Sequence, residues 1–258
     1  MKIRVLGPSY SIEVPLKVLE NKNSSYQQIV VGESEGFGKC LVLDGEIQFA
    51  TVDEYIYHEM LAYPPAIASG AKNALILGGG DGLLARRLLD FGIETSIVEL
   101  DKEVMETCKK YFYEEGSSSL DEADIIIGDA LEYTGGNYDL IYVDLIDYYK
   151  EPALYNREAM EHYKSLLNDS GIIVFHSDYP DMPKIKEAAT PLFKNSITYA
   201  AYVPSFFSLW TFAMFSDNKI DVEKIEKSDI RGRYFSNDMF WRYKDKAVDV
   251  DPNYWEKS

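Results

Sequence analysis

Apolar runs and helically spaced apolar residues alternate along most of the chain from residue 72 onward. Ala74-Leu75-Ile76-Leu77 is an unbroken apolar run that predicts a buried strand, and the spacing over 83–89 predicts a helix. The same alternation predicts further strands over 96–100, 123–130, 138–147 and 172–176, with a helix over 157–167. Strands that alternate with helices indicate βαβ units and a mostly parallel sheet.

The first 55 residues have a different pattern, in which short β-prone runs are separated by turn signals. Residues 27–33 and 39–43 flank the turn sequence 34–38, and Asp44-Gly45 predicts a hairpin that leads into 46–49. This segment therefore indicates a small antiparallel β domain.

A helix is predicted directly after these strands, over residues 52–68. Thr51 is the expected N-cap, and Glu54 stands at the capping-box position. Pro64-Pro65 is expected to interrupt the helix, because proline lacks the backbone N–H that a helix interior needs.

The patterns together predict an α/β protein. Residues 197–202 and 210–215 are β-prone and are expected to close the sheet as an antiparallel pair. We expect an N-terminal β-hairpin domain over 1–55 and a catalytic domain over 56–258. The second domain is predicted to be a Rossmann-like, doubly wound sheet of the methyltransferase kind.

The turn after the first parallel strand carries an acid among glycines. Gly78-Gly79-Gly80-Asp81-Gly82 has the position of a nucleotide-binding turn between a strand and a helix. Gly78 and Gly80 lack a Cβ, so backbone there can approach a ligand closely. A carboxylate at Asp81 would repel the phosphates that helix N-termini attract. The turn therefore favours a positively charged adenosine compound.

Acids follow four successive predicted strands. They are Asp81, Glu99, Asp129, and the pair Asp144 and Asp147. Ligands of open α/β sheets bind outside the carboxyl ends of the strands, so these acids are expected to converge. Glu99 lies roughly 20 residues after the glycine turn, where an acid can accept hydrogen bonds from ribose hydroxyls.

Charge and composition narrow the classes of partner. The 258-residue chain has a formal net charge of −17, which argues against nucleic acid and anionic membranes. No apolar run approaches the ~20 residues that span a bilayer, and the first residues lack the apolar segment of a secretion signal. Cys40 and Cys108 give no disulfide framework, so a cytoplasmic location is expected. The histidines and cysteines have no metal-ligand spacing, and no metal site is expected.

Several short motifs, taken in order, resemble those of the polyamine aminopropyltransferases, the spermidine synthase family. They are Ser25-Tyr26-Gln27, Leu43-Asp44-Gly45 with Gln48, Asp53-Glu54 with Tyr57-His58-Glu59-Met60, the turn 78–82, Val98-Glu99-Leu100-Asp101, Tyr138-Asp139 with Asp144 and Asp147, Trp210-Thr211-Phe212, and 233–237. Each motif alone is weak, but their order and spacing together are highly specific. The likeness covers most of the chain from about residue 25.

The resemblance implies a transferase of polyamine and spermidine biosynthesis. Such enzymes move the aminopropyl group of decarboxylated S-adenosylmethionine to an amine and release methylthioadenosine. The donor is a co-substrate, and no cofactor is implied. By position, the resemblance implies a donor site of Gln27, His58, Gly78, Gly80, Asp81, Glu99, Asp129 and Ala130. It implies an amine site of Tyr57, Asp144, Asp147, His176, Asp178 and Tyr202, with Asp144 as the proton acceptor.

The chemistry of this reaction agrees with the acids. Asp81 can pair with the donor's ammonium and would repel the carboxylate of intact S-adenosylmethionine. The acceptor amine, with a reference pKa of ~10, must lose a proton before it attacks. Asp144 is a carboxylate that can take this proton, and Asp147 can help to bind the amine.

The chain departs from the family pattern on the side expected to bind the amine. Tyr148 stands where proline is common, and the gate loop over 149–153 lacks the usual Gly-Pro. His176 replaces a common glutamine, Asp178 replaces a common glutamate, and the segment 204–210 is about two residues longer. The acceptor therefore stays open among putrescine, agmatine, cadaverine and spermidine.

Two other functions remain open from the sequence. An S-adenosylmethionine-dependent methyltransferase would share the sheet and Glu99, but Asp81 and Asp144 disfavour it. A catalytically silent nucleoside- or polyamine-binding relative would explain the altered gate loop, but the retained Asp144 and Asp147 argue against it. The hairpins around Val30 and Leu43 carry more apolar residues than an isolated hairpin can bury, so a homodimer or homotetramer is expected.

Overall fold

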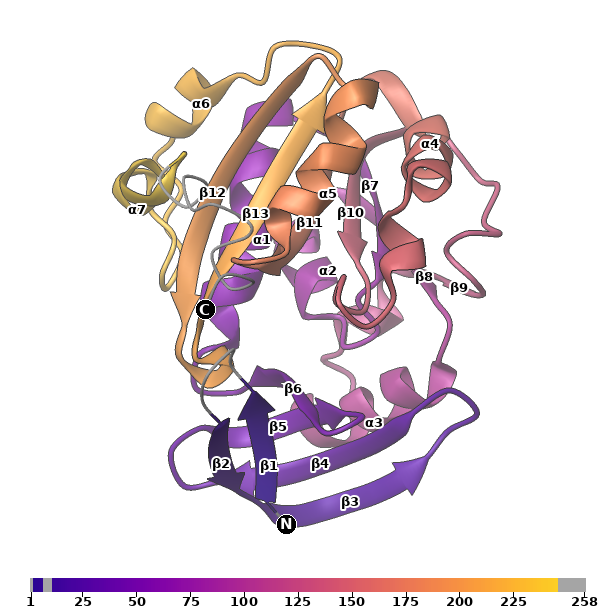
Figure 1. The fold of residues 1–258 in the computed structure, drawn as a ribbon, viewed down its shortest axis with the longest axis vertical. Coiled ribbons are helices and arrows are strands. Elements are labelled where there is room, and N and C mark those ends of the chain that lie inside the picture. The colour runs from indigo at the N-terminus through magenta and orange to yellow at the C-terminus, as the bar shows by residue number, and fades with distance from the viewer. Residues whose placement is uncertain (1, 7–10, 246–258) are drawn as a thin grey trace, which may run out of the picture.

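The computed structural model describes residues 2–6 and 11–245 of the chain. A large mixed sheet with its helices fills the upper part of Figure 1, and a small N-terminal sheet lies across the lower end. The small sheet is antiparallel and consists of β3 (Lys17–Asn23), β4 (Gln28–Ser34), β5 (Gly38–Leu43) and β6 (Glu46–Ala50). The strands β1 (Lys2–Leu6) and β2 (Ser11–Pro15) form a separate antiparallel pair beside it.

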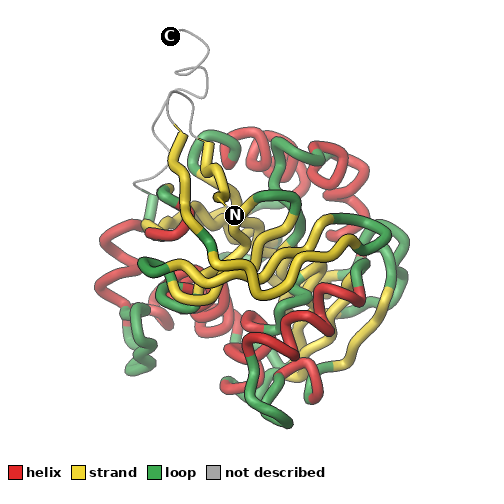
Figure 2. Tube along the Cα trace, turned by 90° about the horizontal axis from the view of Figure 1, so that it is seen from below, coloured by secondary structure: helices red, strands yellow, loops and turns green. Residues whose placement is uncertain are grey.

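The N-terminal sheet confirms the predicted hairpins and buries apolar residues on both faces. Asp44 and Gly45 both adopt positive φ between β5 and β6, which is the geometry of a tight hairpin turn. Val30 packs with Val14 on one face, and Ile29 packs with Val104 of the helix α3 (Lys102–Phe112) on the other. Figure 2 shows this sheet from below, with its strands across the end of the molecule. The chain itself therefore covers these apolar residues, so their number is no argument for assembly.

The central sheet has seven strands in the order β12-β13-β11-β10-β7-β8-β9. The five strands from β11 to β9 are parallel, and β13 runs antiparallel to both of its neighbours. In chain order they are β7 (Asn73–Gly78), β8 (Glu94–Glu99), β9 (Asp124–Ile127), β10 (Tyr138–Asp144), β11 (Leu167–Asp178), β12 (Asn195–Val203) and β13 (Ser208–Ser216). Numbered one to seven, their spatial order is 3-2-1-4-5-7-6. The predicted methyltransferase-like, doubly wound sheet and its antiparallel closing pair are confirmed.

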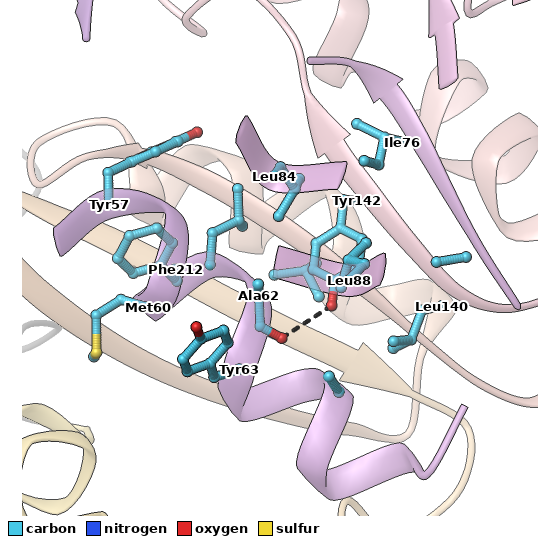
Figure 3. Close-up of a cluster of buried hydrophobic side chains, with 14 of the residues drawn as sticks. Tyr57, Met60, Ala62, Tyr63, Ile76, Leu84, Leu88, Leu140, Tyr142 and Phe212 are labelled. Atoms are coloured by element: carbon cyan, nitrogen blue, oxygen red, sulfur yellow. Dashed lines mark hydrogen bonds between the residues drawn. The ribbon is translucent and has the colours of Figure 1, made fainter. Parts of the chain in front are cut away.

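Alternate residues of the central strands pack into two cores, one on each face of the sheet. Leu140 and Tyr142 face the first core, which α1 (Glu54–Ser69) and α2 (Leu83–Asp90) cover. Ile141 and Val143 face the second core, under α4 (Arg157–Ser165) and α5 (Met182–Ala189). Figure 3 shows the first core, where the Tyr142 hydroxyl donates to the carbonyl of Ala62 at 3.1 Å. Both faces are buried, which explains the unbroken apolar runs of the sequence.

The start of α1 differs from the prediction. The N-cap is Asp53 rather than Thr51, and its side chain makes no capping bond. The Asp53 carboxylate instead accepts from the backbone N–H of Ser205 at 2.7 Å and from its hydroxyl at 2.9 Å. Thr51 accepts from the N–H of Lys39, and Glu54 forms ion pairs rather than a capping box. Tertiary partners have replaced the local capping bonds here.

Pro64 and Pro65 do not interrupt α1, contrary to the prediction. Both lie inside the helix and are buried. An isolated helix would lose roughly 3 kcal/mol or more at such a proline. Twelve of the helix residues are buried against the sheet and neighbouring helices, so packing stabilises the helix against this loss.

Most other element boundaries follow the prediction closely, but three strands differ. β9 covers only Asp124–Ile127 of the predicted 123–130, β10 ends at Asp144 rather than at residue 147, and β11 begins before the predicted 172–176. The strand β11 begins at Leu167 and includes the exposed polar residues Asp169 and Ser170, which precede the apolar run. The remaining helices are α6 (Val222–Glu226) and α7 (Asn237–Tyr243), with short 3-10 turns at Ser119–Asp121, Pro152–Tyr155, Thr190–Leu192 and Pro204–Phe206.

A buried carboxylate on α1 binds the segment that leads into α7. Glu59, 3% exposed, accepts from the backbone N–H groups of Arg233, Tyr234 and Phe235 at 2.8–2.9 Å. A Cβ on Gly232 would lie 2.1 Å from Glu59 Oε2, so only glycine allows this close approach. Two motifs that are far apart in the sequence are therefore parts of one contact.

We expect Glu59→Ala to lower the free energy of unfolding by about 2–4 kcal/mol. The substitution removes the acceptor of three N–H donors, of which only that of Phe235 is buried, and a buried donor left unpaired costs roughly 1–3 kcal/mol. Urea unfolding monitored by circular dichroism measures the change. The matched control is Glu132→Ala, at an exposed glutamate. An equal, small effect in both variants would contradict a stabilising role for Glu59.

Candidate active site

A cavity of about 610 Å³ lies between the N-terminal sheet and the carboxyl ends of the parallel strands. The strand ends that contribute to it belong to β7, β8, β9 and β10, as the topology predicts. Its lining includes the predicted site residues Gln27, Tyr57, Gly78, Gly80, Asp81, Glu99, Asp129, Ala130, Asp144, Asp147 and His176. The expected convergence of the strand-end acids is confirmed as geometry.

The glycine turn lies close to the neighbouring strand ends. Gly78 has a φ of +87°, and a Cβ there would meet the carbonyl oxygen of Asp144 at 2.0 Å. A Cβ on Gly80 would lie 2.7 Å from Oε2 of Glu99. Glycine at these positions therefore allows the ends of β7, β8 and β10 to meet around one cavity.

Asp81 lines the cavity and also makes a hydrogen bond within the protein. Its Oδ1 accepts from the backbone N–H of Leu83 at 2.7 Å, at the start of α2. The same oxygen lies 3.8 Å from Nε2 of His58. The carboxylate is therefore held in place by the helix start while it faces the cavity and a histidine.

His58 is buried behind Asp81 and belongs to a chain of alternating charges. Its Nδ1 lies 2.8 Å from the carbonyl oxygen of Glu54 and 2.9 Å from the Glu54 carboxylate, which also pairs with Arg87 at 3.0 Å. Burial disfavours a charged ring, but the hydrogen bonds and charges of Asp81 and Glu54 outweigh it. They raise the pKa of His58 to about 10, so the ring is cationic at neutral pH. His58 contacts Asp81 rather than the cavity.

Glu99 ends β8 and is linked through Asp101 to the segment before β4. Its Oε1 accepts from the backbone N–H of Asp101 at 2.8 Å. Burial raises the pKa of Glu99 to about 7, with a further contribution from the nearby Asp101 carboxylate. Asp101 in turn accepts from Nε2 of Gln27 at 3.0 Å and from Ser24 at 2.6 Å. These bonds hold Gln27 at the same edge of the cavity as Glu99.

Asp129 and Ala130 follow β9 and complete this edge. Asp129 Oδ1 accepts from the backbone N–H of Leu131 at 2.8 Å, and the carbonyl of Ala130 lies 3.1 Å from Nε2 of His162. Both residues line the cavity together with the exposed side chain of Tyr26. The surface there combines acidic and apolar groups, which suits a nucleoside.

Asp144, at the end of β10, is surrounded by polar donors. The Tyr57 hydroxyl donates to its Oδ1 at 2.5 Å, and Nε2 of His176 lies 3.2 Å from the same oxygen, although its N–H is not aimed directly at it. Burial would raise the pKa of Asp144, but the donor groups of His176 and Tyr57 hold it below its usual value. The indole N–H of Trp210 donates to Nδ1 of His176 at 3.1 Å.

The segment after β10 is attached to the N-terminal sheet across the cavity. Lys150 Nζ lies 2.6 Å from Oε2 of Glu46, and the Tyr149 hydroxyl donates to Glu46. Asp147 lies in the same segment, and burial, reinforced by the charge of Glu46, raises its pKa to about 6. The gate loop therefore rests on β6 although it lacks the Gly-Pro pair.

Two of the predicted amine-site residues do not line the cavity with the others. Tyr202 is 50% exposed on β12, because its neighbours Ala201 and Val203 face the core and strand alternation turns Tyr202 away. Asp178 ends β11 outside the lining, and burial together with the charges of Asp181 and Asp147 raises its pKa to about 7.

Some residues of the site were not predicted from the sequence. Phe206 and Trp210 line the cavity, with ring centroids 4.8 Å apart, and Lys150 lines it from the gate loop. The motif that contains Trp210 pointed to this residue, whereas nothing local connects Lys150 with Glu46. That ion pair exists only because the fold brings the two segments together.

Neither a metal site nor a membrane-spanning helix is found within residues 2–6 and 11–245. No group of three or more His, Cys, Asp or Glu side chains in these ranges is placed to hold a metal ion. No helix within the same ranges is long and apolar enough to cross a membrane.

Two family models match the chain. The spermine/spermidine synthase domain matches residues 54–225, and the spermidine synthase tetramerisation domain matches residues 7–51. The chain is 35% identical over 231 residues to a polyamine aminopropyltransferase of Thermoplasma volcanium, covering 84% of this chain and 83% of that protein. It is 32% identical over 243 residues to the polyamine aminopropyltransferase of Saccharolobus solfataricus, covering 85% and 81%.

Solved structures agree with the fold. A spermidine synthase in complex with the transition-state analogue AdoDATO has a TM-score of 0.80, with 22% identity, and covers 96% of this chain and 90% of that one. The spermidine synthase of Thermotoga maritima has a TM-score of 0.77, with 23% identity and the same coverage. Because the family models and the relatives extend over most of its length, the chain belongs to the spermine/spermidine synthase family of aminopropyltransferase enzymes.

Proposed function

We propose that the chain transfers the aminopropyl group of decarboxylated S-adenosylmethionine to an amine and releases methylthioadenosine. The observation that carries this proposal is one cavity with Asp81 in the glycine turn and Asp144 with Asp147 at the adjacent strand end. Carboxylates thus face both of the cations that the reaction brings together. Relatives named polyamine aminopropyltransferase, and a spermidine synthase that binds AdoDATO, support the same reaction.

The donor's nucleoside is assigned to the edge formed by β8 and β9. Glu99 accepts hydrogen bonds from the ribose hydroxyls, as an acid at the end of the second strand does in such folds. Gln27, Asp129 and Ala130 border the same space. Burial leaves the pKa of Glu99 near 7, and hydroxyl donors that bind the ionised form would lower it.

The donor's ammonium is assigned to Asp81. This carboxylate is fixed by its bond to Leu83 and is ready to receive a cation without rearrangement. The carboxylate of intact S-adenosylmethionine would face Asp81 and be repelled. A methyltransferase needs that intact donor, so the charge of Asp81 favours aminopropyl transfer.

Asp144 is assigned as the base of the transfer. The acceptor's ammonium, bound by Asp144 and Asp147, gives a proton to Asp144. The freed nitrogen lone pair attacks the carbon next to the sulfonium, and the C–S electron pair returns to sulfur as methylthioadenosine leaves. The cavity must hold nitrogen, carbon and sulfur in line for this displacement.

The acceptor is assigned as an amine longer than putrescine, such as cadaverine, agmatine or spermidine. A diamine needs a second anchor several ångströms from the base, and neither Asp178 nor Tyr202 reaches the cavity lining. The lining also includes Lys150 and Glu151, and Glu151 offers a carboxylate besides Asp144 and Asp147. We assign Glu151 as the anchor for the far end of a longer amine.

A turnover assay tests the reaction and both substrates. We expect methylthioadenosine to form from decarboxylated S-adenosylmethionine and an amine, and not from the intact donor. In a competition among putrescine, cadaverine, agmatine and spermidine, we expect a longer amine to be preferred. Putrescine as the clear favourite would exclude the longer acceptor alone. No product from any amine, or methyl transfer from the intact donor, would exclude the proposed function.

Asp81→Asn tests the donor site. Asparagine keeps the oxygen that accepts from Leu83 but removes the charge. We expect binding of decarboxylated S-adenosylmethionine to weaken by roughly 10-fold, as the loss of about 1.4 kcal/mol would give. Binding of methylthioadenosine, which lacks the ammonium arm, should change little. Calorimetry with both compounds measures the difference, and equal weakening of both would contradict this role of Asp81.

Asp144→Asn tests the base. The amide keeps the shape of the side chain and cannot take the amine's proton, so turnover should fall by roughly 10²–10⁴-fold. Methylthioadenosine should still bind. Asp124→Asn, at an exposed aspartate where β9 begins, is the control. Near-normal turnover of the Asp144 variant would remove Asp144 from the role and make Asp147 the next candidate.

We also propose that the chain assembles as a homodimer or homotetramer through its N-terminal segment. The match of residues 7–51 to a spermidine synthase tetramerisation domain supports this assembly. Light scattering at micromolar concentration should give two or four times the mass of one chain. A monomer under these conditions would contradict the proposal.

A further inference from the structure

His176 lines the cavity, and each of its two ring nitrogens lies near a polar group of a neighbouring strand. The Trp210 indole N–H donates to Nδ1 at 3.1 Å, and Nε2 lies 3.2 Å from Asp144 Oδ1. Both rings are largely buried, with 5% and 8% exposure, and they stack at an interplanar angle of 26°. Solvent has little access to either nitrogen.

The partner on Nδ1 determines where the proton of the neutral ring lies. An indole nitrogen is a donor only, so Nδ1 must offer its lone pair to Trp210. The ring proton then lies on Nε2, on the side of Asp144. A cationic ring would need a second proton on Nδ1, which would point at the indole N–H and break the bond. Trp210 therefore opposes protonation of His176.

The other groups around His176 favour protonation. Asp144 on β10 lies beside Nε2, and the charge of Asp147 also acts on this ring. Tyr57 on α1 packs edge-on against it at 5.4 Å between ring centroids, and its hydroxyl is bonded to Asp144. Two carboxylates thus stabilise an imidazolium, and the indole N–H is the group that works against them.

The charge of His176 matters because Asp144 must stay available to the amine. An imidazolium would form an ion pair with Asp144 and occupy the carboxylate that the acceptor's ammonium needs. It would also repel that ammonium directly. A neutral ring leaves the charge of the carboxylate uncompensated.

We propose that Trp210 is a positioning residue for aminopropyl transfer, whose indole N–H keeps His176 neutral so that Asp144 remains free for the acceptor's ammonium. The expected effect of Trp210 on turnover rests on the proposed function. The state of the His176 ring itself does not depend on that function.

The ring state is tested first, in the wild-type protein. Nitrogen-15 NMR of the histidine side chains, with His176→Gln to assign the signal, reports which ring nitrogens carry protons. We expect Nε2 protonated and Nδ1 unprotonated at pH 6.5 and above. A ring protonated on both nitrogens at pH 6.5 would overturn the inference, whatever reaction the enzyme catalyses.

Turnover of Trp210→Phe is the second test. Phenylalanine keeps an aromatic ring and removes the N–H, so His176 can become cationic. We measure kcat/KM for the amine in the variant and divide it by the wild-type value at the same pH. We expect this ratio to fall at least 10-fold as the pH is lowered from 8.5 to 6. Methylthioadenosine binding should change less than twofold. A constant ratio across this pH range would overturn the inference, because loss of packing alone has no pH dependence.

A double variant separates charge from packing. Glutamine at position 176 can accept from the indole and donate toward Asp144, and it cannot become cationic. We compare kcat/KM for the amine in Trp210→Phe/His176→Gln with that in His176→Gln alone. The ratio of these two values should be independent of pH. A pH-dependent ratio in this background would assign the effect to another group and overturn the inference. A wild-type enzyme without methylthioadenosine production would instead refute the proposed function, and the NMR result would still decide the ring state.

Discussion

Burying several carboxylates around one cavity is unfavourable unless each has a partner, and this constraint determines much of the structure. Asp81 lies against the cationic His58, Glu99 receives a backbone N–H, and Asp144 accepts from the Tyr57 hydroxyl and lies 3.2 Å from Nε2 of His176. These partners do not fully stabilise the ionised carboxylates, because burial still raises the pKa of Glu99 to about 7 and that of Asp147 to about 6. Cations and hydroxyl donors from a ligand would stabilise the ionised forms further. The cavity therefore favours a cationic ligand that also carries hydroxyl donors, and the proposed donor has both.

The pairing of the central strands fixes the positions of these acids relative to one another. Gly78 and Asp144 are register partners on adjacent parallel strands, so the glycine turn and the proposed base are separated by about one strand spacing, roughly 4.7–4.9 Å. A Cβ at Gly78 would collide with the Asp144 carbonyl, and one at Gly80 would collide with Glu99. The glycines thus matter as much for bringing strand ends together as for admitting a ligand. The N-terminal sheet closes the opposite side, where Glu46 holds the gate loop.

Local patterns predicted the strands and the converging acids, because both depend on periodicity and on the rule that parallel strands end at one edge. They failed where long-range contacts decide. Pro64-Pro65 remains helical because its helix is buried, and Asp53 binds Ser205 instead of capping. The correspondence of Asp178 to a common glutamate of the family did not show that Asp178 lies outside the cavity lining. A single sequence does not indicate that Glu46 contacts Lys150 or that Trp210 contacts His176, because these residues are far apart along the chain.

The two ends of the cavity use different partners for their carboxylates, and the proposed reaction gives a reason. The donor's ammonium stays charged throughout the transfer, so Asp81 can share its charge with the cationic His58 and still hold the arm. The acceptor's ammonium must lose its proton. A cationic neighbour on Asp144 would weaken it as a base, whereas the Tyr57 hydroxyl orients the carboxylate without cancelling its charge, and the proposed neutral state of His176 would leave that charge intact. A cationic histidine at one end and a neutral one at the other would then suit Asp81 for binding and Asp144 for proton transfer.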